Sequence, residues 1–242
     1  MDEHHDEPAR RRIAGWLVHV YTAAGAWVGL MAAIHILSGD NRSALLWLTL
    51  AVLIDASDGW LARRLQVKAL VPSIDGARLD DIVDYVTFTF LPILMIYRSG
   101  WLPYPAELWT FFPLVTSLLA FANVRAKEGG FFRGFPSYWN IVAFYIAIWL
   151  HAYGPWVVLG VVLALSCMSI LPVRFVYPTR TPRMAFWFVL GGLLWLPIIA
   201  LILGVFFPDP PNWLLMLSLV YPGFYVVLSI YMDVADRRQR SR

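Results

Sequence analysis

Apolar residues run along this chain in long stretches that are separated by short polar breaks. Most of these stretches reach the roughly 20 residues that a helix needs to cross the hydrocarbon core of a bilayer, although the fifth is short. The pattern predicts an all-α, polytopic integral membrane protein with about eight transmembrane helices, forming a single domain over residues 1–242. The predicted spans are residues 13–38, 43–64, 76–97, 104–124, 138–152, 155–173, 184–206 and 212–233.

Positive charges gather at every second break between these spans. Short cytoplasmic loops retain Lys and Arg, so their distribution orients the chain in the membrane. With the N-terminus inside, only Arg42 and Arg98 of the 19 Lys and Arg residues fall on the outer side. The sequence therefore predicts a multi-pass protein of the cell inner (cytoplasmic) membrane with both termini in the cytoplasm.

Composition narrows the classes of function. Hydrophobic residues make up 60% of the chain and charged residues 14%, against about 25% charged in soluble domains, which excludes a soluble or disordered protein. The net charge of +3 forms no continuous basic face, so no nucleic-acid partner is expected.

Gly25 and Gly29 have the spacing that lets membrane helices approach closely. Packing within the chain is the expected use of that spacing, and a homodimer seam is the alternative.

Five acids lie within the second and third predicted spans, close to the loop that joins them, and all but Asp81, which is expected to pair with Arg78, form two spaced pairs. Asp55 and Asp58 are three residues apart and Asp80 and Asp84 four, so each pair occupies one face of its helix. Carboxylates inside a membrane cost several kcal/mol unless they are paired or coordinate an ion, and they are therefore candidates for function. The two helices are predicted to direct four carboxylates toward each other near the cytoplasmic surface.

Two interpretations of this acidic cluster compete. Hard oxygen ligands suit Mg²⁺ or Mn²⁺, which commonly take substrate phosphates as further ligands. Alternatively, nearby cations neutralise the acids as structural ion pairs; the candidates are Arg63, Arg64, Lys68 and Arg78. Gly59 and Gly76 favour the metal interpretation, because each leaves space for a ligand beside an acid. Close helix packing is the alternative for Gly76.

Read as one pattern, Asp-x2-Asp-Gly-x2-Ala-Arg at 55–63 followed by Gly-x3-Asp-x3-Asp at 76–84 resembles the signature of the CDP-alcohol phosphotransferase family. The spacer at 64–75 is longer than in most members. It is similar to that of a bacterial branch that condenses CDP-diacylglycerol with free choline, as is the segment Phe131–Asn140.

The resemblance implies a function and a role for each matching residue. The enzyme would transfer the phosphatidyl group of CDP-diacylglycerol to choline with release of CMP, among membrane lipids. Asp84 would be the catalytic base and also a metal ligand. The full metal set would be Asp55, Asp58, Asp80 and Asp84, holding two divalent ions, Mn²⁺ or Mg²⁺. The substrate-binding residues for the CDP group would be Gly59, Ala62, Arg63 and Gly76.

The acceptor alcohol rests on weaker signals. A quaternary ammonium cannot donate hydrogen bonds, so a choline site needs aromatic faces, and Tyr138 and Trp139 are the candidates. An interfacial aromatic belt is the alternative for both residues. Serine, inositol phosphate or glycerol phosphate could replace choline in the same chemistry. An ion-coupled transporter remains a distant alternative.

Overall fold

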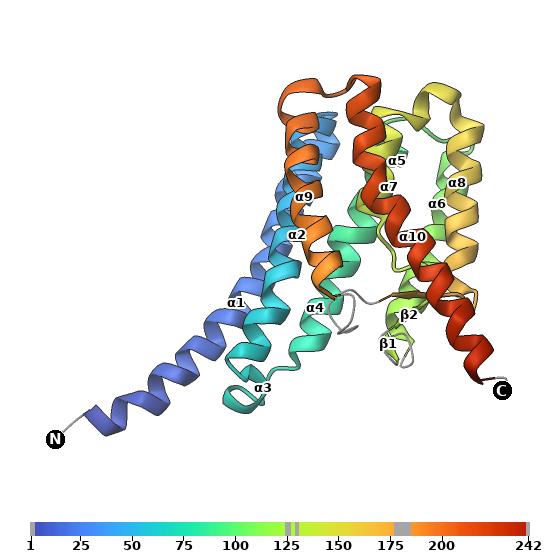
Figure 1. The fold of residues 1–242 in the computed structure, drawn as a ribbon. Coiled ribbons are helices and arrows are strands. Elements are labelled where there is room, and N and C mark those ends of the chain that lie inside the picture. Colours follow the sequence, from blue (N-terminus) through green and yellow to red (C-terminus); the bar gives the residue numbers. More distant parts are fainter. Residues whose placement is uncertain (1–2, 124–126, 129–130, 177–184, 241–242) are drawn as a thin grey trace.

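A computed structural model of the chain describes residues 3–123, 127–128, 131–176 and 185–240. Within these residues, a helical stretch coincides with each of the eight predicted spans, so the prediction of an all-α polytopic architecture is confirmed (Figure 1). Both ends of the chain lie at the same end of the bundle. The spans therefore alternate in direction, as the charge pattern requires.

Helices make up most of the described residues, with three short strands among them. Their bounds are α1 (Glu3–Ser38), α2 (Asn41–Arg64), α3 (Val67–Leu70), α4 (Gly76–Asp84), η1 (Tyr85–Phe90), α5 (Leu91–Arg98), α6 (Ala106–Ala122), β1 (Lys127–Glu128), β2 (Phe131–Arg133), α7 (Trp139–Ile148), η2 (Leu150–Tyr153), α8 (Pro155–Ile170), β3 (Arg174–Val176), α9 (Ala185–Leu201), η3 (Ile202–Phe206) and α10 (Asn212–Arg240).

The spans differ in length. Among the described residues, four helices are long and apolar enough to cross a membrane alone: residues 9–38, 41–64, 186–206 and 212–235. Shorter apolar helices occupy residues 106–122, 139–148 and 155–170. The third predicted span is the continuous run α4–η1–α5 over residues 76–98, in which η1 is a π-helical segment. Its six residues follow directly after Asp84, and π turns inside helices often occur at functional sites.

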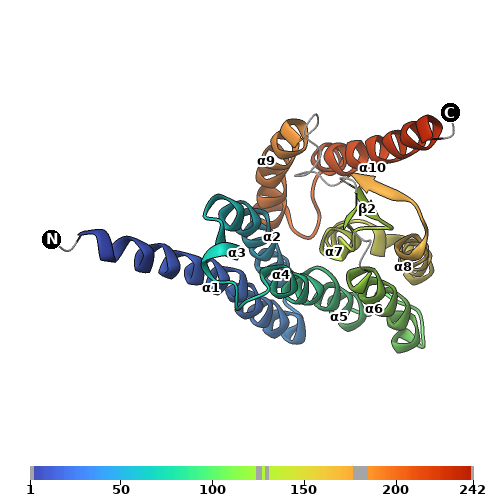
Figure 2. The ribbon, with the colours of Figure 1, turned by 90° about the horizontal axis from the view of Figure 1, so that it is seen from below.

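Seen along the bundle, α1, α2 and α4 occupy one side, α6, α7 and α8 another, and α9 and α10 run along a third (Figure 2). Large apolar side chains are exposed over the outer surface, among them Leu17, Leu119 and Val227, at 60% or more. Several small polar residues are fully buried instead, including Ser117, Ser218 and Ser229. This distribution is typical of a bundle whose solvent is lipid.

One face of α1 supports the helices that carry the acids. An added Cβ at Gly25 would lie 2.6 Å from Val83, and one at Gly29 would lie 3.3 Å from Thr87 and from Leu91. Gly25 and Gly29 therefore allow α1 to pack closely against α4, η1 and α5. Packing within the chain is confirmed as the use of this spacing, and a homodimer stays a prediction.

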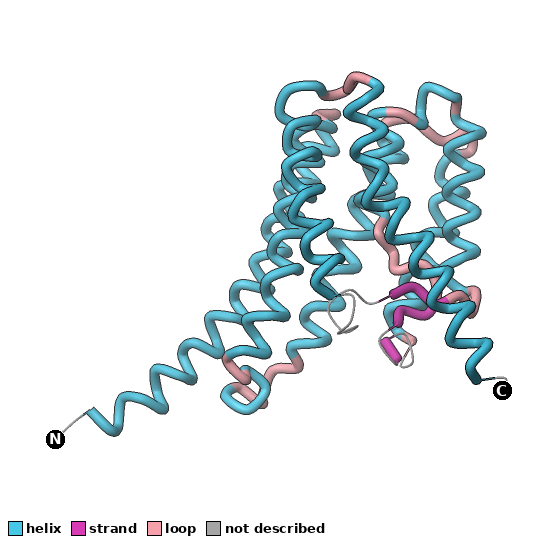
Figure 3. The backbone as a smooth tube through the Cα atoms, viewed as in Figure 1, coloured by secondary structure: helices cyan, strands magenta, loops and turns pink. Residues whose placement is uncertain are grey.

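A small antiparallel sheet, in the order β1–β2–β3, lies at the same end of the molecule as both termini (Figure 3). The hydrophobic pattern of the sequence does not predict this sheet. Strand β3 is tied to α10, because the Ser229 hydroxyl accepts from the Val176 N–H at 3.1 Å and Arg174 pairs with Asp233 at 2.7 Å. The sheet therefore fixes the position of α10 relative to the chain that enters α7.

Topology can be tested with single cysteines in a Cys167→Ser background. The loop between α2 and α4 lies at the end of the bundle that holds both termini (Figure 1), and the Tyr104 loop lies at the other end. Arg125, Arg180, Arg183 and Arg242, which the charge pattern places in the cytoplasm, lie outside the described residues. We expect Ser73→Cys to react with a membrane-impermeant maleimide only in inverted vesicles, and Tyr104→Cys only in intact cells. The reverse pattern would contradict the orientation.

Candidate active site

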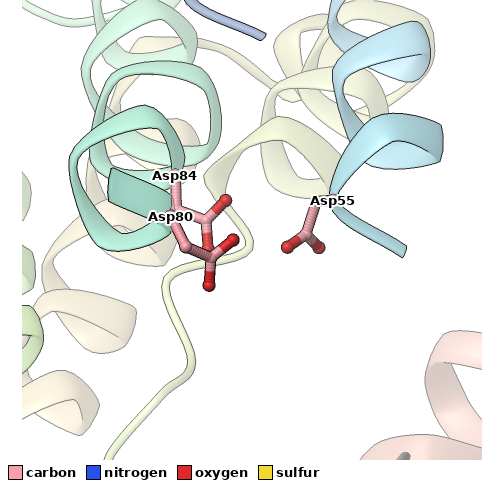
Figure 4. A group of neighbouring side chains, drawn as sticks. All are labelled: Asp55, Asp80 and Asp84. Carbon is pink, nitrogen blue, oxygen red and sulfur yellow. The ribbon is translucent and has the colours of Figure 1, made fainter. Parts of the chain in front are cut away.

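Three of the four predicted acids converge. One carboxylate oxygen from each of Asp55, Asp80 and Asp84 lies within 4.8 Å of the others, and all three residues are half-buried. Asp55 projects from α2, while Asp80 and Asp84 project from α4 toward it (Figure 4). We call these residues the carboxylate triad.

Local structure explains why the triad forms. Helix α4 begins at Gly76, where the Asp75 carboxylate accepts a hydrogen bond from the Arg78 N–H and caps the helix. Asp80 and Asp84 then lie one turn apart on the same face. The connection through α3 reverses the chain, so that the start of α4 lies beside the last turns of α2.

Asp58 has a different environment. It is only 5% exposed, and its Oδ2 accepts a hydrogen bond of 2.7 Å from the Thr22 hydroxyl of α1. The described group of acids that could hold one metal ion contains the triad but not Asp58. The structure thus brings three predicted ligands together, while Asp58 faces α1; its metal role stays a prediction.

The predicted CDP-binding residues border the same part of the molecule. An added Cβ at Gly59 would lie 3.2 Å from the Arg63 guanidinium, on the exposed side of α2. Ala62 is half-buried one turn further along the helix. A Cβ at Gly76 would lie 3.1 Å from the imidazole of His19, so close helix packing does occur there.

His19 is a candidate site residue that the sequence motifs do not include. Its side chain is 8% exposed, and its Nε2 atom has no hydrogen-bond partner among the described residues. A buried polar atom of this kind costs about 1–3 kcal/mol unless a ligand or water satisfies it. In the sequence, the one feature that points to His19 as a functional residue is that this polar side chain lies inside the first predicted span, three residues before Thr22.

The alternative interpretation, in which nearby Arg and Lys side chains neutralise the acids, can be checked against the contacts that these side chains make. The Arg64 guanidinium lies over the Trp60 ring, 5.0 Å from its centroid. Arg78 pairs with Asp75 at 3.3 Å, and both side chains are exposed. Two of the four candidate cations therefore have partners outside the triad.

The donor chemistry of the triad fits a divalent cation. Carboxylate oxygens are hard ligands that suit Mg²⁺ or Mn²⁺. Three ionised carboxylates within 4.8 Å repel one another by roughly 3 kcal/mol or more per pair at an effective dielectric constant of about 20. A divalent ion bound between them would remove this repulsion.

The two aromatic candidates for the acceptor site lie in different surroundings. Trp139 is completely buried, and its indole N–H donates to the Ser117 hydroxyl at 2.8 Å. Tyr138, which precedes the first residue of α7, is half-buried, and its ring lies 6.4 Å from the ring of Phe88, which follows Asp84 by four residues. Of the two, Tyr138 is the more exposed.

The chain is similar to a known protein family and to several named proteins. Residues 17–172 match the family model described as CDP-alcohol phosphatidyltransferase. The chain is 38% identical to a phosphatidylcholine synthase of Pseudomonas aeruginosa over 74% of this chain and 79% of that protein. It is 38% identical to one of Legionella pneumophila, over 90% and 88%, and 31% identical to one of Rhizobium meliloti, over 95% of each. The chain belongs to the CDP-alcohol phosphatidyltransferase family.

Proposed function

We propose that the protein transfers the phosphatidyl group of CDP-diacylglycerol to choline and releases CMP. The observation that carries this proposal is the convergence of the signature residues Asp55, Asp80 and Asp84 within 4.8 Å at one end of a membrane bundle. The choice of choline is supported by relatives named phosphatidylcholine synthase, which are 31–41% identical to this chain.

The reaction is a single displacement at phosphorus. The hydroxyl oxygen of choline attacks the phosphorus that bears diacylglycerol, and the bond from that phosphorus to the bridging oxygen breaks. CMP leaves with the bonding electrons. The proton of the hydroxyl moves to Asp84, whose carboxylate acts as general base, because an alcohol is a weak nucleophile until it loses its proton. No residue of the chain becomes covalently modified.

The triad is proposed to hold divalent metal, Mn²⁺ or Mg²⁺, with two ions and with Asp58 as a further ligand according to the family signature. The chemistry that such ions supply is neutralisation of the pyrophosphate charge and of the charge that develops on the leaving CMP. Asp55 and Asp80 contribute to this site from facing helices, so the spacing of α2 and α4 determines the size of the site.

The CDP group is proposed to bind beside Gly59, Ala62, Arg63 and Gly76. Neither glycine has a side chain that would obstruct the ligand, and the exposed Arg63 guanidinium can pair with a phosphate. The unsatisfied Nε2 of His19, next to Gly76, supports a polar ligand at this position. The acyl chains of CDP-diacylglycerol remain in the bilayer. The protein is proposed to lie in the inner membrane with the triad at its cytoplasmic end.

Asp84→Asn tests the assignment of the base. We expect turnover to fall by about 10²–10⁴-fold or more, because the asparagine amide cannot accept the proton, while CDP-diacylglycerol still binds. Asp55→Asn and Asp80→Asn should in addition weaken Mn²⁺ binding, measured by titration calorimetry or electron paramagnetic resonance. Turnover is followed as CMP release.

A matched control is Asp209→Asn, which changes an exposed acid in the loop between η3 and α10, outside the triad. This variant should keep parental turnover and Mn²⁺ affinity. Near-normal turnover of Asp84→Asn would contradict its role as the base.

The acceptor is tested with purified protein, CDP-diacylglycerol and a panel of alcohols, with CMP and the lipid product both measured. We expect phosphatidylcholine as the main product, loss of CMP release after EDTA treatment, and recovery on addition of Mn²⁺ or Mg²⁺. Faster turnover with serine, inositol phosphate or glycerol phosphate than with choline would contradict the proposed acceptor.

A further inference from the structure

Three aromatic residues from distant parts of the chain meet beside the carboxylate triad. The Tyr138 ring, at the entry to α7, lies 6.4 Å from the ring of Phe88 in η1 and 6.0 Å from the ring of Tyr225 in α10, measured between centroids. Phe88 and Tyr225 are 6% and 8% exposed, whereas Tyr138 is half-buried. Tyr138 is therefore the most exposed member of this group, with the other two rings beside it.

This aromatic group is continuous with the triad. Phe88 follows Asp84 by four residues on the same helical run, and the Tyr138 ring lies beside the Phe88 ring. Helix α7 packs against both α2 and η1. In Figure 4, the pale yellow-green chain that leads into α7 passes between α4 and α2, behind Asp80 and Asp84. The chain that carries Tyr138 thus runs beside the triad.

The aromatic group is held rigidly. The Tyr225 hydroxyl donates to the Val176 carbonyl of β3 at 3.0 Å, and the Tyr225 ring stacks on Phe175 at 6.2 Å. The Tyr225 ring also packs against Phe188, 5.9 Å away between centroids. Since β3 is also tied to α10 by the pair of Arg174 and Asp233, the sheet fixes the position of Tyr225. Rings fixed in advance lose little conformational freedom when a ligand binds.

We infer that Tyr138, backed by Tyr225 and Phe88, forms the binding site for the quaternary ammonium group of the acceptor. The inference rests on the proposed function. A trimethylammonium group has no N–H to donate, and it is bound best by aromatic faces together with nearby negative charge. Only two carbon atoms separate the nitrogen of choline from its oxygen. An ammonium at Tyr138 therefore leaves the hydroxyl next to the triad, where Asp84 takes the proton.

Trp139, the other aromatic candidate, has no part in this site. Its side chain is fully buried in a cluster with Ile93, Ile96 and Val158, and its N–H is bound to Ser117. Tyr138 and Trp139 are adjacent in sequence but contribute to different clusters.

The test compares choline with its uncharged analogue 3,3-dimethylbutan-1-ol, in which carbon replaces nitrogen. We expect Tyr138→Leu to raise the choline KM by about five- to thirtyfold, which corresponds to the roughly 1–2 kcal/mol of a cation–π contact. Tyr138→Phe should stay within about threefold of the parent, because the ring is kept. The preference for choline over the analogue should fall in Tyr138→Leu, whereas the KM for CDP-diacylglycerol should not change.

Tyr104→Leu, at a tyrosine that is 92% exposed at the other end of the bundle, is the matched control and should leave every value unchanged. If Tyr138→Leu does not fold, Phe88→Leu replaces it, with a smaller loss of preference expected in the same direction. An unchanged choline KM, or an equal loss of choline and analogue binding, would overturn the site. A parent protein that does not use choline would instead overturn the proposed function.

Discussion

Mutual repulsion among three carboxylates is the constraint on which the active-site end of this molecule depends. Asp55, Asp80 and Asp84 lie within 4.8 Å of one another inside an apolar bundle, where ionised groups are poorly solvated. Such a cluster spreads apart unless its helices are held together and a cation is bound. Much of the packing around the triad holds α2 and α4 at the distance that brings these three carboxylates together.

Helix α1 supplies the larger part of that support. Residues of one face of α1 contact both acid-bearing helices: Thr22 binds Asp58 of α2, His19 packs on Gly76, and Gly25 packs on Val83 of α4. Removing the Thr22 hydroxyl would leave a buried carboxylate without this donor, which typically costs about 1–3 kcal/mol. The contact of Asp58 with α1 therefore stabilises the end of α2 that carries Asp55.

The sequence predicts those parts of the site that depend on one helix at a time. Spacings of three and four residues place each pair of acids on one face, and the eight apolar runs with their charged breaks predict the spans. Spacing does not determine which neighbouring helix a face meets. For this reason the sequence predicts neither the contact of Asp58 with Thr22 nor the hydrogen bond from Trp139 to Ser117. Family membership also removes the transporter alternative.

The aromatic group and the small sheet could not be predicted for a related reason. Tyr225 lies 87 positions after Tyr138 in the chain, and no local pattern connects them. Their contact depends on β3, whose short strand joins the loop before α7 to α10. Long-range pairings of this kind form only when the whole bundle assembles. The spacing of apolar residues along the sequence therefore does not predict them.

The π segment η1 has a consequence for how this protein can vary in length. Hydrogen bonds from residue i to i+5 make a π turn one residue longer than an α turn. Removing one residue from 85–90 would therefore convert this turn to an α turn and keep Leu91 and Met95 facing the core. A change of length by one residue at this point would alter the turn that follows Asp84 rather than the packing of α5.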